Sequence, residues 1–231
     1  MQRLARCELD AGSGVWRYAE NNKREIDSHW DAAKSHHPAY FNGVIFLIDA
    51  LECGTDAIQA RLLKTDFKSY LFWRDNGWPE AGVLDGFGSA LIRSCDGAIV
   101  LGRQNAGHVN SGLTYLPGGF IDARDVREDG VVDIAACIGR ELIEETGLGI
   151  GDLEAEPGYF VTRTGPHVSF AKPFTSRLDA KTLMQKIESH IRADAGAELS
   201  GVVAVRQLRD LDGLEMAHYA RVLVTALLNG A

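Results

Sequence analysis

Three glutamates stand close together near the middle of the chain, within the stretch Arg-Glu-Leu-Ile-Glu-Glu-Thr-Gly-Leu. Glu141, Glu144 and Glu145 are spaced at i, i+3 and i+4, so a helix here places all three carboxylates on one face. Like charges at this spacing destabilise a helix by roughly 0.2–0.5 kcal/mol per pair. Mg²⁺ takes oxygen ligands, which such a face supplies. The spacing therefore indicates a site for a hard divalent cation.

The same trio has a simpler explanation. Acidic faces are common on exposed helices, and Arg140 could pair with Glu144 at i, i+4. Taken alone, the three glutamates fit a solvated surface about as well as a metal site. The choice depends on the residues around them, of which Gly147 is one, because it can end the helix in the left-handed conformation.

The elements that must position this helix alternate between strands and helices. Asp133 is a candidate N-cap, and the stripe Ile134, Ile138 and Leu142 predicts a buried face. Asp96-Gly97 predicts a hairpin between two strands. The predicted strands lie over 86–92, 98–103, 159–164, 167–175 and 202–205, and further helices lie over 181–192 and 215–228. This alternation predicts the α/β class with a mixed sheet.

Residues 1–83 form a separate block before this region. A helical pattern runs over 20–35, and short strands are predicted over 14–18, 44–48 and 58–63. We therefore expect an N-terminal α+β lobe over 1–83 and a main domain over 84–231.

Composition limits the partners. The chain of 231 residues has a net charge of −8, which argues against binding nucleic acid or an anionic membrane. No apolar run approaches the roughly 18 residues of a transmembrane helix, and the N-terminus does not resemble a signal peptide. The four cysteines form no C-x-x-C pair. We expect a cytoplasmic protein without disulfides or a zinc site.

Two motifs together carry a family resemblance. Pro117-Gly118-Gly119 followed by residues 140–148 resembles the signature of the Nudix hydrolases, and the second part fits the family pattern at every position. With this pattern attached, the exposed-surface explanation of the glutamates loses most of its weight. The resemblance implies a Nudix fold, an α/β/α sandwich with a mixed sheet, and Mg²⁺-dependent hydrolysis with Mn²⁺ as an alternative metal.

The spacing departs from the family pattern at one place. Gly119 lies 21 residues before Arg140, about seven more than is usual, and the insert falls in 123–133. Asp122 stands where many members have a glutamate. The glutamate that usually lies between the loop and the helix is either Glu128 or replaced by Asp133, and the sequence leaves both open.

The resemblance also assigns roles to residues. Glu141, Glu144 and Glu145 would coordinate the metal, with the carbonyl of Gly119 close by, and Arg140 would orient one of the carboxylates. One of these carboxylates or Glu198 would act as general base, although Glu198 is equally well explained as an exposed loop acid. Residues at strand ends are candidates to contact phosphate: Arg103 and Arg163.

A shorter resemblance lies in the N-terminal block. His29-Trp30 followed by residues 37–43 is similar to an element of Nudix members that act on nucleotide sugars, which makes Tyr40 a candidate substrate contact. Trp73 could stack on a nucleobase, but an aromatic cluster of Tyr70, Phe72, Trp73 and Trp78 is more typical of a core or a dimer contact. A homodimer is therefore one expectation.

These observations favour hydrolysis of a nucleoside diphosphate linked to another group, such as a nucleotide sugar, to give a nucleoside monophosphate. One alternative is a CoA or ADP-ribose diphosphatase, because inserts near the motif occur in such members. Another is a non-catalytic nucleotide-binding module of the same fold. The intact set of glutamates counts against the module.

Overall fold

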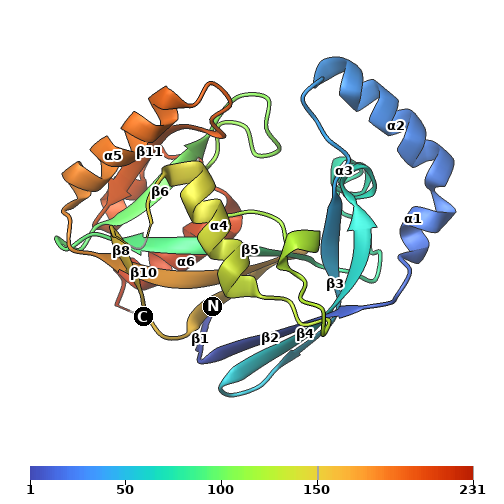
Figure 1. Ribbon diagram of the computed structural model, residues 1–231, viewed down its shortest axis with the longest axis horizontal. Helices are drawn as coiled ribbons and strands as arrows, with labels where there is room; N and C mark the ends of the chain where they lie inside the picture. Colours follow the sequence, from blue (N-terminus) through green and yellow to red (C-terminus); the bar gives the residue numbers. More distant parts are fainter. Residues whose placement is uncertain (150, 231) are drawn as a thin grey trace.

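The computed structural model describes residues 1–149 and 151–230. Its strands form an eight-stranded sheet and a three-stranded sheet, with helices packed against both (Figure 1). The architecture is therefore α/β with a mixed sheet, as the sequence predicted.

One central strand makes the large sheet mixed. β10 (His167–Ser176) runs parallel to β5 (Asp85–Arg93) and antiparallel to β9 (Tyr159–Thr164). The predicted hairpin between β5 and β6 also forms, with Gly97 at a φ of 80°. The other strands of this sheet are β1 (Gln2–Leu4), β6 (Ile99–Gln104), β7 (Thr114–Tyr115), β8 (Leu153–Ala155) and β11 (Leu199–Val205).

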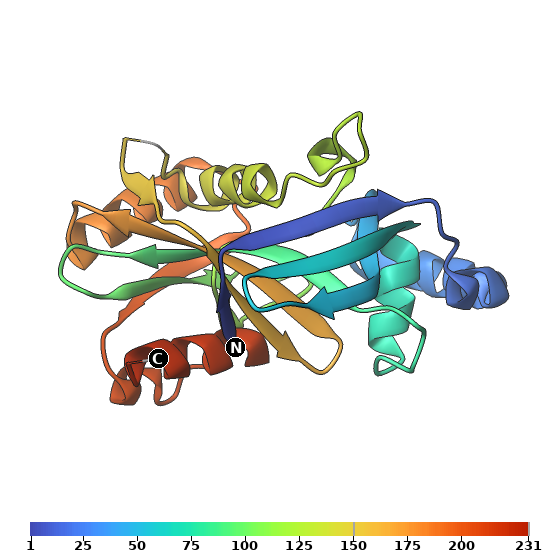
Figure 2. The same cartoon turned by 90° about the horizontal axis from the view of Figure 1, so that it is seen from below.

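Helices cover both faces of the large sheet (Figure 2). α4 (Ile134–Thr146) and α5 (Ala180–Ala193) lie together on one face, and α6 (His218–Leu228) lies on the other. The apolar stripe of α4 is buried as predicted, because Ile134, Ile138 and Leu142 are at most 3% exposed. No helix in the described part of the chain is long and apolar enough to cross a membrane.

The small sheet belongs to the N-terminal lobe, on the right in Figure 1. Its strand order is β2 (Arg6–Gly12), β4 (Ala57–Asp66) and β3 (Val44–Cys53), and its helices are α1 (Arg17–Asn21), α2 (Lys23–His36) and α3 (Phe67–Asp75). The strand predicted over 14–18 is wrong, because the chain turns into α1 there. Trp16 precedes α1 and is buried edge-on against Trp73, so it anchors the lobe core and does not lie in a sheet.

Trp73 does not take the substrate-contacting position considered for it. It lies in α3 with 1% of its surface exposed, and its indole N–H donates to the carbonyl of Pro79 at 2.8 Å. The aromatic cluster is mainly the core of the lobe, as the more conservative interpretation held. Trp73 is buried because α3 packs its aromatic face onto β3 and β4.

The lobe and the main domain are joined through β1, through the insert and through β3, where Ile48 and Leu84 exchange backbone hydrogen bonds at 2.8 and 2.9 Å. β1 pairs with β9, so residues 2–4 lie in the large sheet, although we expected the whole block 1–83 to form the lobe. The insert 123–133 begins with a 3₁₀ turn, η1 (Ala123–Asp125), and then binds β2 through its backbone. The N–H of Val132 donates to Leu9 and the N–H of Ala11 donates to Gly130, both at 2.8 Å.

Candidate active site

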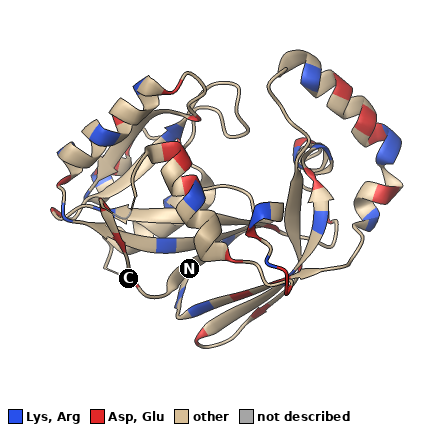
Figure 3. Ribbon diagram, viewed as in Figure 1, with Lys and Arg blue, Asp and Glu red and all other residues tan. Residues whose placement is uncertain are grey.

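The ends of α4 are fixed by local chemistry. Asp133 accepts a hydrogen bond from the N–H of Ala136 at 3.0 Å, as the N-cap prediction required. At the other end Gly147 adopts a φ of 67° and donates its N–H to the carbonyl of Ile143. The acidic segment lies in the last turns of this helix (Figure 3). With both ends fixed, the register of the glutamates relative to the sheet is fixed too.

The Pro117–Gly119 segment runs along the free edge of β5, opposite these glutamates. The N–H of Gly88 donates to Gly119 at 3.1 Å, and the N–H of Ala90 donates to Pro117 at 2.7 Å. A Cβ on Gly118 would lie 2.1 Å from the carbonyl oxygen of Gly88. Only glycine permits this close approach, which explains the Pro-Gly-Gly sequence.

Glu141 lies directly against this segment. A Cβ on Gly119 would come within 2.5 Å of Glu141 Oε2, so the carboxylate fills the space that a side chain would need. The side chain is 15% exposed and forms an ion pair with Arg140. Burial raises the pKa of Glu141 to about 7, although Arg140 opposes that rise.

Glu145 lies deeper than Glu141. Tyr115 Oη donates to its Oε1 at 2.6 Å, and the N–H of Gly118 donates to its Oε2 at 2.9 Å. Burial raises the pKa of Glu145 to about 8, and the charge of Glu198 adds to the rise. Each carboxylate oxygen retains a lone pair beyond these hydrogen bonds.

Glu144 and Glu198 are the accessible carboxylates. Glu144 is half exposed and lies 3.5 Å from Arg140 and 3.7 Å from Arg124. Glu198 is exposed beside β11, and its charge also raises the pKa of Glu141. Glu198, although distant in the sequence, lines the same cavity as Glu141 and Glu144.

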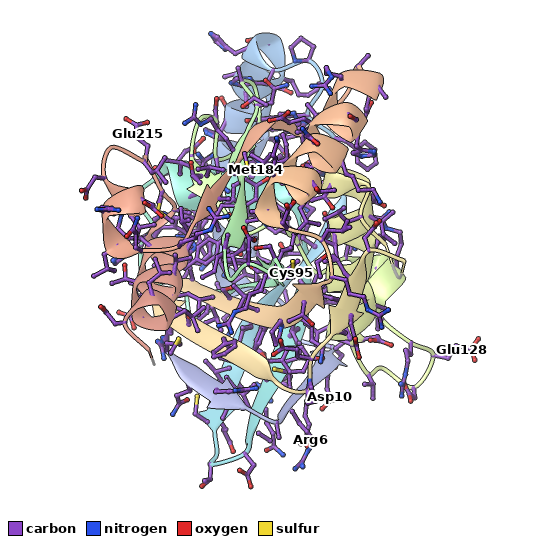
Figure 4. All side chains as sticks on the ribbon, turned by 90° about the vertical axis from the view of Figure 1, so that its left-hand side faces the viewer. Arg6, Asp10, Cys95, Glu128, Met184 and Glu215 are labelled. Carbon is purple, nitrogen blue, oxygen red and sulfur yellow. The ribbon has the colours of Figure 1, made fainter. Side chains whose placement is uncertain are left out.

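Arg140 is held by an aspartate that the sequence analysis did not single out. Its guanidinium donates to both oxygens of Asp125, at 3.0 and 3.1 Å, and Asp125 is buried. Neither residue proposed for the position before the helix contacts Arg140. Glu128 is exposed at the outer end of the insert (Figure 4), and Asp133 caps α4. The signal available in the sequence was Asp122-x-x-Asp125, a capping-box pattern.

The donor set fits a hard divalent cation. Among the described residues, no three Asp, Glu, His or Cys side chains converge closely enough to hold a metal as they stand. Yet the carboxylates of Glu141 and Glu145 are both buried, the charge of Glu198 raises the pKa of each, and the charge of Glu141 also raises the pKa of Glu145. A cation would relieve that repulsion, and carboxylate and carbonyl oxygens are ligands that Mg²⁺ prefers.

A cavity of about 1130 Å³ opens beside these carboxylates, between the main domain and the lobe. Its wall includes Gly119, Glu141, Glu144 and Glu198, and Tyr40 lines it from the lobe. The volume exceeds that of a typical small-ligand pocket, about 300–1,000 Å³. It suits a ligand with two large parts.

The strand-end arginines do not line this cavity among the described residues. Arg103 on β6 and Arg163 on β9 both face solvent elsewhere. The cations in the wall are instead Arg124, from the insert, and Arg74, from α3. Sequence analysis missed both, because the fold of the insert and of the lobe brings them there.

The sequence of this chain matches a known protein family. A family model described as the NUDIX domain matches residues 85–223, which is more than half of the chain. The chain belongs to the Nudix family. It is a Nudix-type hydrolase, of the class that acts on nucleoside diphosphates linked to another group. No curated protein matches this Nudix chain.

Solved structures are similar to this chain at low sequence identity and low TM-score. A Nudix hydrolase from M. Smegmatis, RenU, is 15% identical over 63% of this chain and 87% of its own, with a TM-score of 0.42. The MutT protein from Methanosarcina mazei Go1 is 21% identical over 64% of this chain and 96% of its own, with a TM-score of 0.40. A bifunctional NMN adenylyltransferase/ADP ribose pyrophosphatase from Francisella tularensis, complexed with AMP and a Mn ion, is 20% identical over 63% of this chain and 41% of its own, with a TM-score of 0.40.

Proposed function

We propose that this Nudix hydrolase uses Mg²⁺, with Mn²⁺ as an alternative, to cleave the diphosphate of a nucleoside diphosphate linked to a second group, for which a nucleotide sugar is the first candidate. The observation that carries the proposal is the single cavity that joins the carboxylates of α4 to the N-terminal lobe. A substrate small enough to bind to the main domain alone would not need the lobe, whereas a substrate in two parts would contact both the main domain and the lobe.

The chain's own residues have separate tasks in this reaction. Glu141 and Glu144 would hold the cation, with Glu145 and the carbonyl of Gly119 completing the set. When bound, the cation neutralises phosphate oxygens and lowers the pKa of water. Arg140 positions Glu141, and the buried Asp125 positions Arg140. Arg124 and Arg74 supply positive charge where the diphosphate and its leaving half would lie.

The bond changes are those of a hydrolysis. The oxygen of a water molecule bonds to one phosphorus atom, the bond between that phosphorus and the bridging oxygen breaks, and the bridging oxygen leaves with the other phosphate. The water proton passes to a carboxylate, for which Glu198 and Glu144 are the accessible candidates because both line the cavity. The products are a nucleoside monophosphate and the phosphorylated second group.

The test is product analysis on a panel of UDP-sugars, GDP-mannose, ADP-ribose, NADH and CoA with Mg²⁺. We expect a nucleoside monophosphate from at least one nucleotide sugar, at a higher kcat/KM than from ADP-ribose or CoA. Preference for either of those would replace the nucleotide-sugar proposal. Nucleotide binding by the folded protein without any turnover would support a non-catalytic module instead.

A further inference from the structure

A buried polar pair lies in the wall of the same cavity, outside the Nudix motif. β5 and β10 both begin there, and their parallel register sets His167 opposite Asp85. His167 Nδ1 lies 3.0 Å from Asp85 Oδ2, and Tyr70 Oη donates to the same oxygen at 3.1 Å. All three residues line the cavity. No role in metal binding or hydrolysis has yet been given to them.

Two acceptor atoms of this pair are unused by the described protein. Asp85 is 3% exposed, and its Oδ1 is buried without a hydrogen-bond partner. A buried carboxylate oxygen without a partner is rare in folded proteins and calls for a ligand or another donor. His167 Nε2 makes no hydrogen bond to a described residue and is not among the buried unpaired atoms, so it remains open to the cavity.

The hydrogen-bonding network sets the tautomer of His167. An ionised carboxylate can only accept hydrogen bonds, so His167 Nδ1 carries the hydrogen and donates it to Asp85 Oδ2 in a hydrogen bond. In the neutral form of the ring, Nε2 then carries a lone pair. His167 Nε2 is therefore the acceptor that is open to a ligand N–H, whereas Asp85 Oδ1 is buried.

Aromatic rings frame these acceptors. Trp78 stands edge-on to the His167 ring at 4.7 Å between centroids, and Phe87 lies at 6.4 Å. Tyr219 of α6 packs against Phe87 at 4.7 Å. Trp78 has a φ of 59°, which is uncommon for a residue with a bulky side chain. Its backbone N–H donates to the carbonyl of Trp73 at 3.1 Å. Backbone strain of this kind is concentrated at binding sites.

The pair is separated from the carboxylates along β5. Gly88 bonds to Gly119 beside Glu141, and Asp85 lies three residues earlier on the same strand. At the rise of an extended strand, this separation is about 10 Å. A diphosphate held at Glu141 would thus be linked to a group at His167 through a spacer such as ribose.

We propose that Asp85, His167, Trp78 and Phe87 form the subsite for the nucleobase of the substrate. The aromatic rings contact the faces of the base, and an N–H on its edge donates to His167 Nε2. His167 is a specificity-determining residue, and Asp85 positions it. This inference rests on the proposed function, because it assumes a nucleotide substrate.

A catalytic role for the pair is disfavoured by its surroundings. Among the described residues, no serine, threonine or cysteine side chain bonds to His167, so no activated nucleophile is present. The distance along β5 also keeps the pair away from the diphosphate. We therefore expect its loss to affect binding of substrate more than turnover.

The experiment measures binding without Mg²⁺ by calorimetry. The ligands are UMP, CMP, AMP, GMP, ribose 5-phosphate, which lacks a base, and a sugar 1-phosphate, which represents the other half of the substrate. The proteins are the wild type, His167→Ala, Asp85→Asn and the control His36→Ala, which alters an exposed histidine of α2 outside this cavity. We expect His167→Ala to weaken the best-bound nucleotide at least 10-fold and to leave ribose 5-phosphate within 2-fold. Asp85→Asn should weaken the nucleotide less, and His36→Ala should change neither.

Several results would overturn the proposal. Equal losses for the nucleotide and ribose 5-phosphate would make His167 a phosphate contact. Loss of binding for a sugar 1-phosphate alone would assign the pair to the other half of the substrate. Absence of nucleotide binding to the wild type would also overturn it. If His167→Ala fails to fold, His167→Gln retains an acceptor and is compared with His167→Leu, which has none.

Steady-state kinetics separates this inference from the proposed function. We expect His167→Ala to raise KM at least 10-fold and to change kcat by less than 3-fold. A fall in kcat at constant KM would contradict the specificity role. If the wild type binds nucleotides through His167 but hydrolyses no diphosphate, the proposed function fails and the subsite stands. If it hydrolyses them and His167→Ala leaves KM unchanged for every base, only the subsite fails.

Discussion

Asp125, carried by the insert, holds the guanidinium of Arg140 through both of its carboxylate oxygens, at 3.0 and 3.1 Å. Arg140 in turn pairs with Glu141, so the insert is connected to the proposed metal site through Arg140, and a second connection is the pair of Arg124 with Glu144 at 3.7 Å. Arg140 is therefore still held by a carboxylate although the motif spacing is longer than usual. The insert itself carries that carboxylate, Asp125.

Removing Asp125 should destabilise the fold as well as the site. Asp125→Ala would remove the hydrogen bonds of Asp125 to the largely buried Arg140, which typically costs about 1.5–3 kcal/mol. Urea denaturation measures the free energy of unfolding. The control is Asp129→Ala, whose pair with Arg127 is exposed on both sides and should contribute less than about 1 kcal/mol. Equal effects from the two variants would contradict the role given to Asp125.

Alanine at the two glycines near Glu141 should have different effects: Gly119→Ala should lower activity, and Gly139→Ala should raise stability. In Gly119→Ala the new Cβ would come within 2.5 Å of the Glu141 carboxylate, so kcat should fall by roughly 10- to 100-fold as the metal ligand is displaced. Gly139 in α4 has open space around its Cβ position, and Gly139→Ala should stabilise the helix by roughly 0.5–1 kcal/mol. Activity assays and thermal unfolding report both effects. Full activity in Gly119→Ala would place Glu141 outside the site.

Mg²⁺ should stabilise the folded protein in a way that depends on the carboxylates. At a concentration 100 times its Kd, a ligand that binds only the folded state contributes about 2.7 kcal/mol. We expect the cation to raise the Tm of the wild type and to have little effect on the double variant Glu141→Gln/Glu144→Gln. Glu128→Gln, at the exposed end of the insert, is the matched control and should respond like the wild type. A rise in Tm that survives in the double variant would move the metal to another site.

Thiol labelling tests the burial of the cysteines. Cys53 and Cys95 are exposed, whereas Cys137 is buried and burial raises the pKa of Cys7 to about 12. The thiolate is the reactive form, so Cys7 and Cys137 should react slowly. We expect two thiols to react quickly with a thiol reagent in the native protein and all four after denaturation. Rapid labelling of Cys137 would show that α4 does not pack on the sheet as described.

Local patterns predicted the main domain well. The N-cap at Asp133, the stop at Gly147 and the hairpin at Asp96-Gly97 depend on residues close together in the sequence, and each is observed. The spacing of the three glutamates on one helix also follows from local sequence, and two of them, Glu141 and Glu145, lie beside the glycine segment. Periodicity and capping are sufficient for such features.

The rest of the site depends on contacts between distant segments, which a single sequence does not encode locally. Asp125 reaches Arg140 because the insert folds back over β2, and His167 meets Asp85 because two strands 82 residues apart are parallel neighbours. Trp73 and Trp78 have the same aromatic character, yet only Trp78 lines the cavity. Residue type alone could not separate the two.

The Mg²⁺ dependence of hydrolysis in the wild type and in Glu144→Gln tests whether α4 carries a catalytic metal site. Glu144 is half exposed, so its substitution should leave the fold intact. On the best substrate of the panel, we predict release of a nucleoside monophosphate that requires Mg²⁺ and falls by about 100-fold or more in the variant, with an unchanged Tm without metal. Hydrolysis that proceeds equally well without a divalent cation, or in Glu144→Gln, would contradict the account.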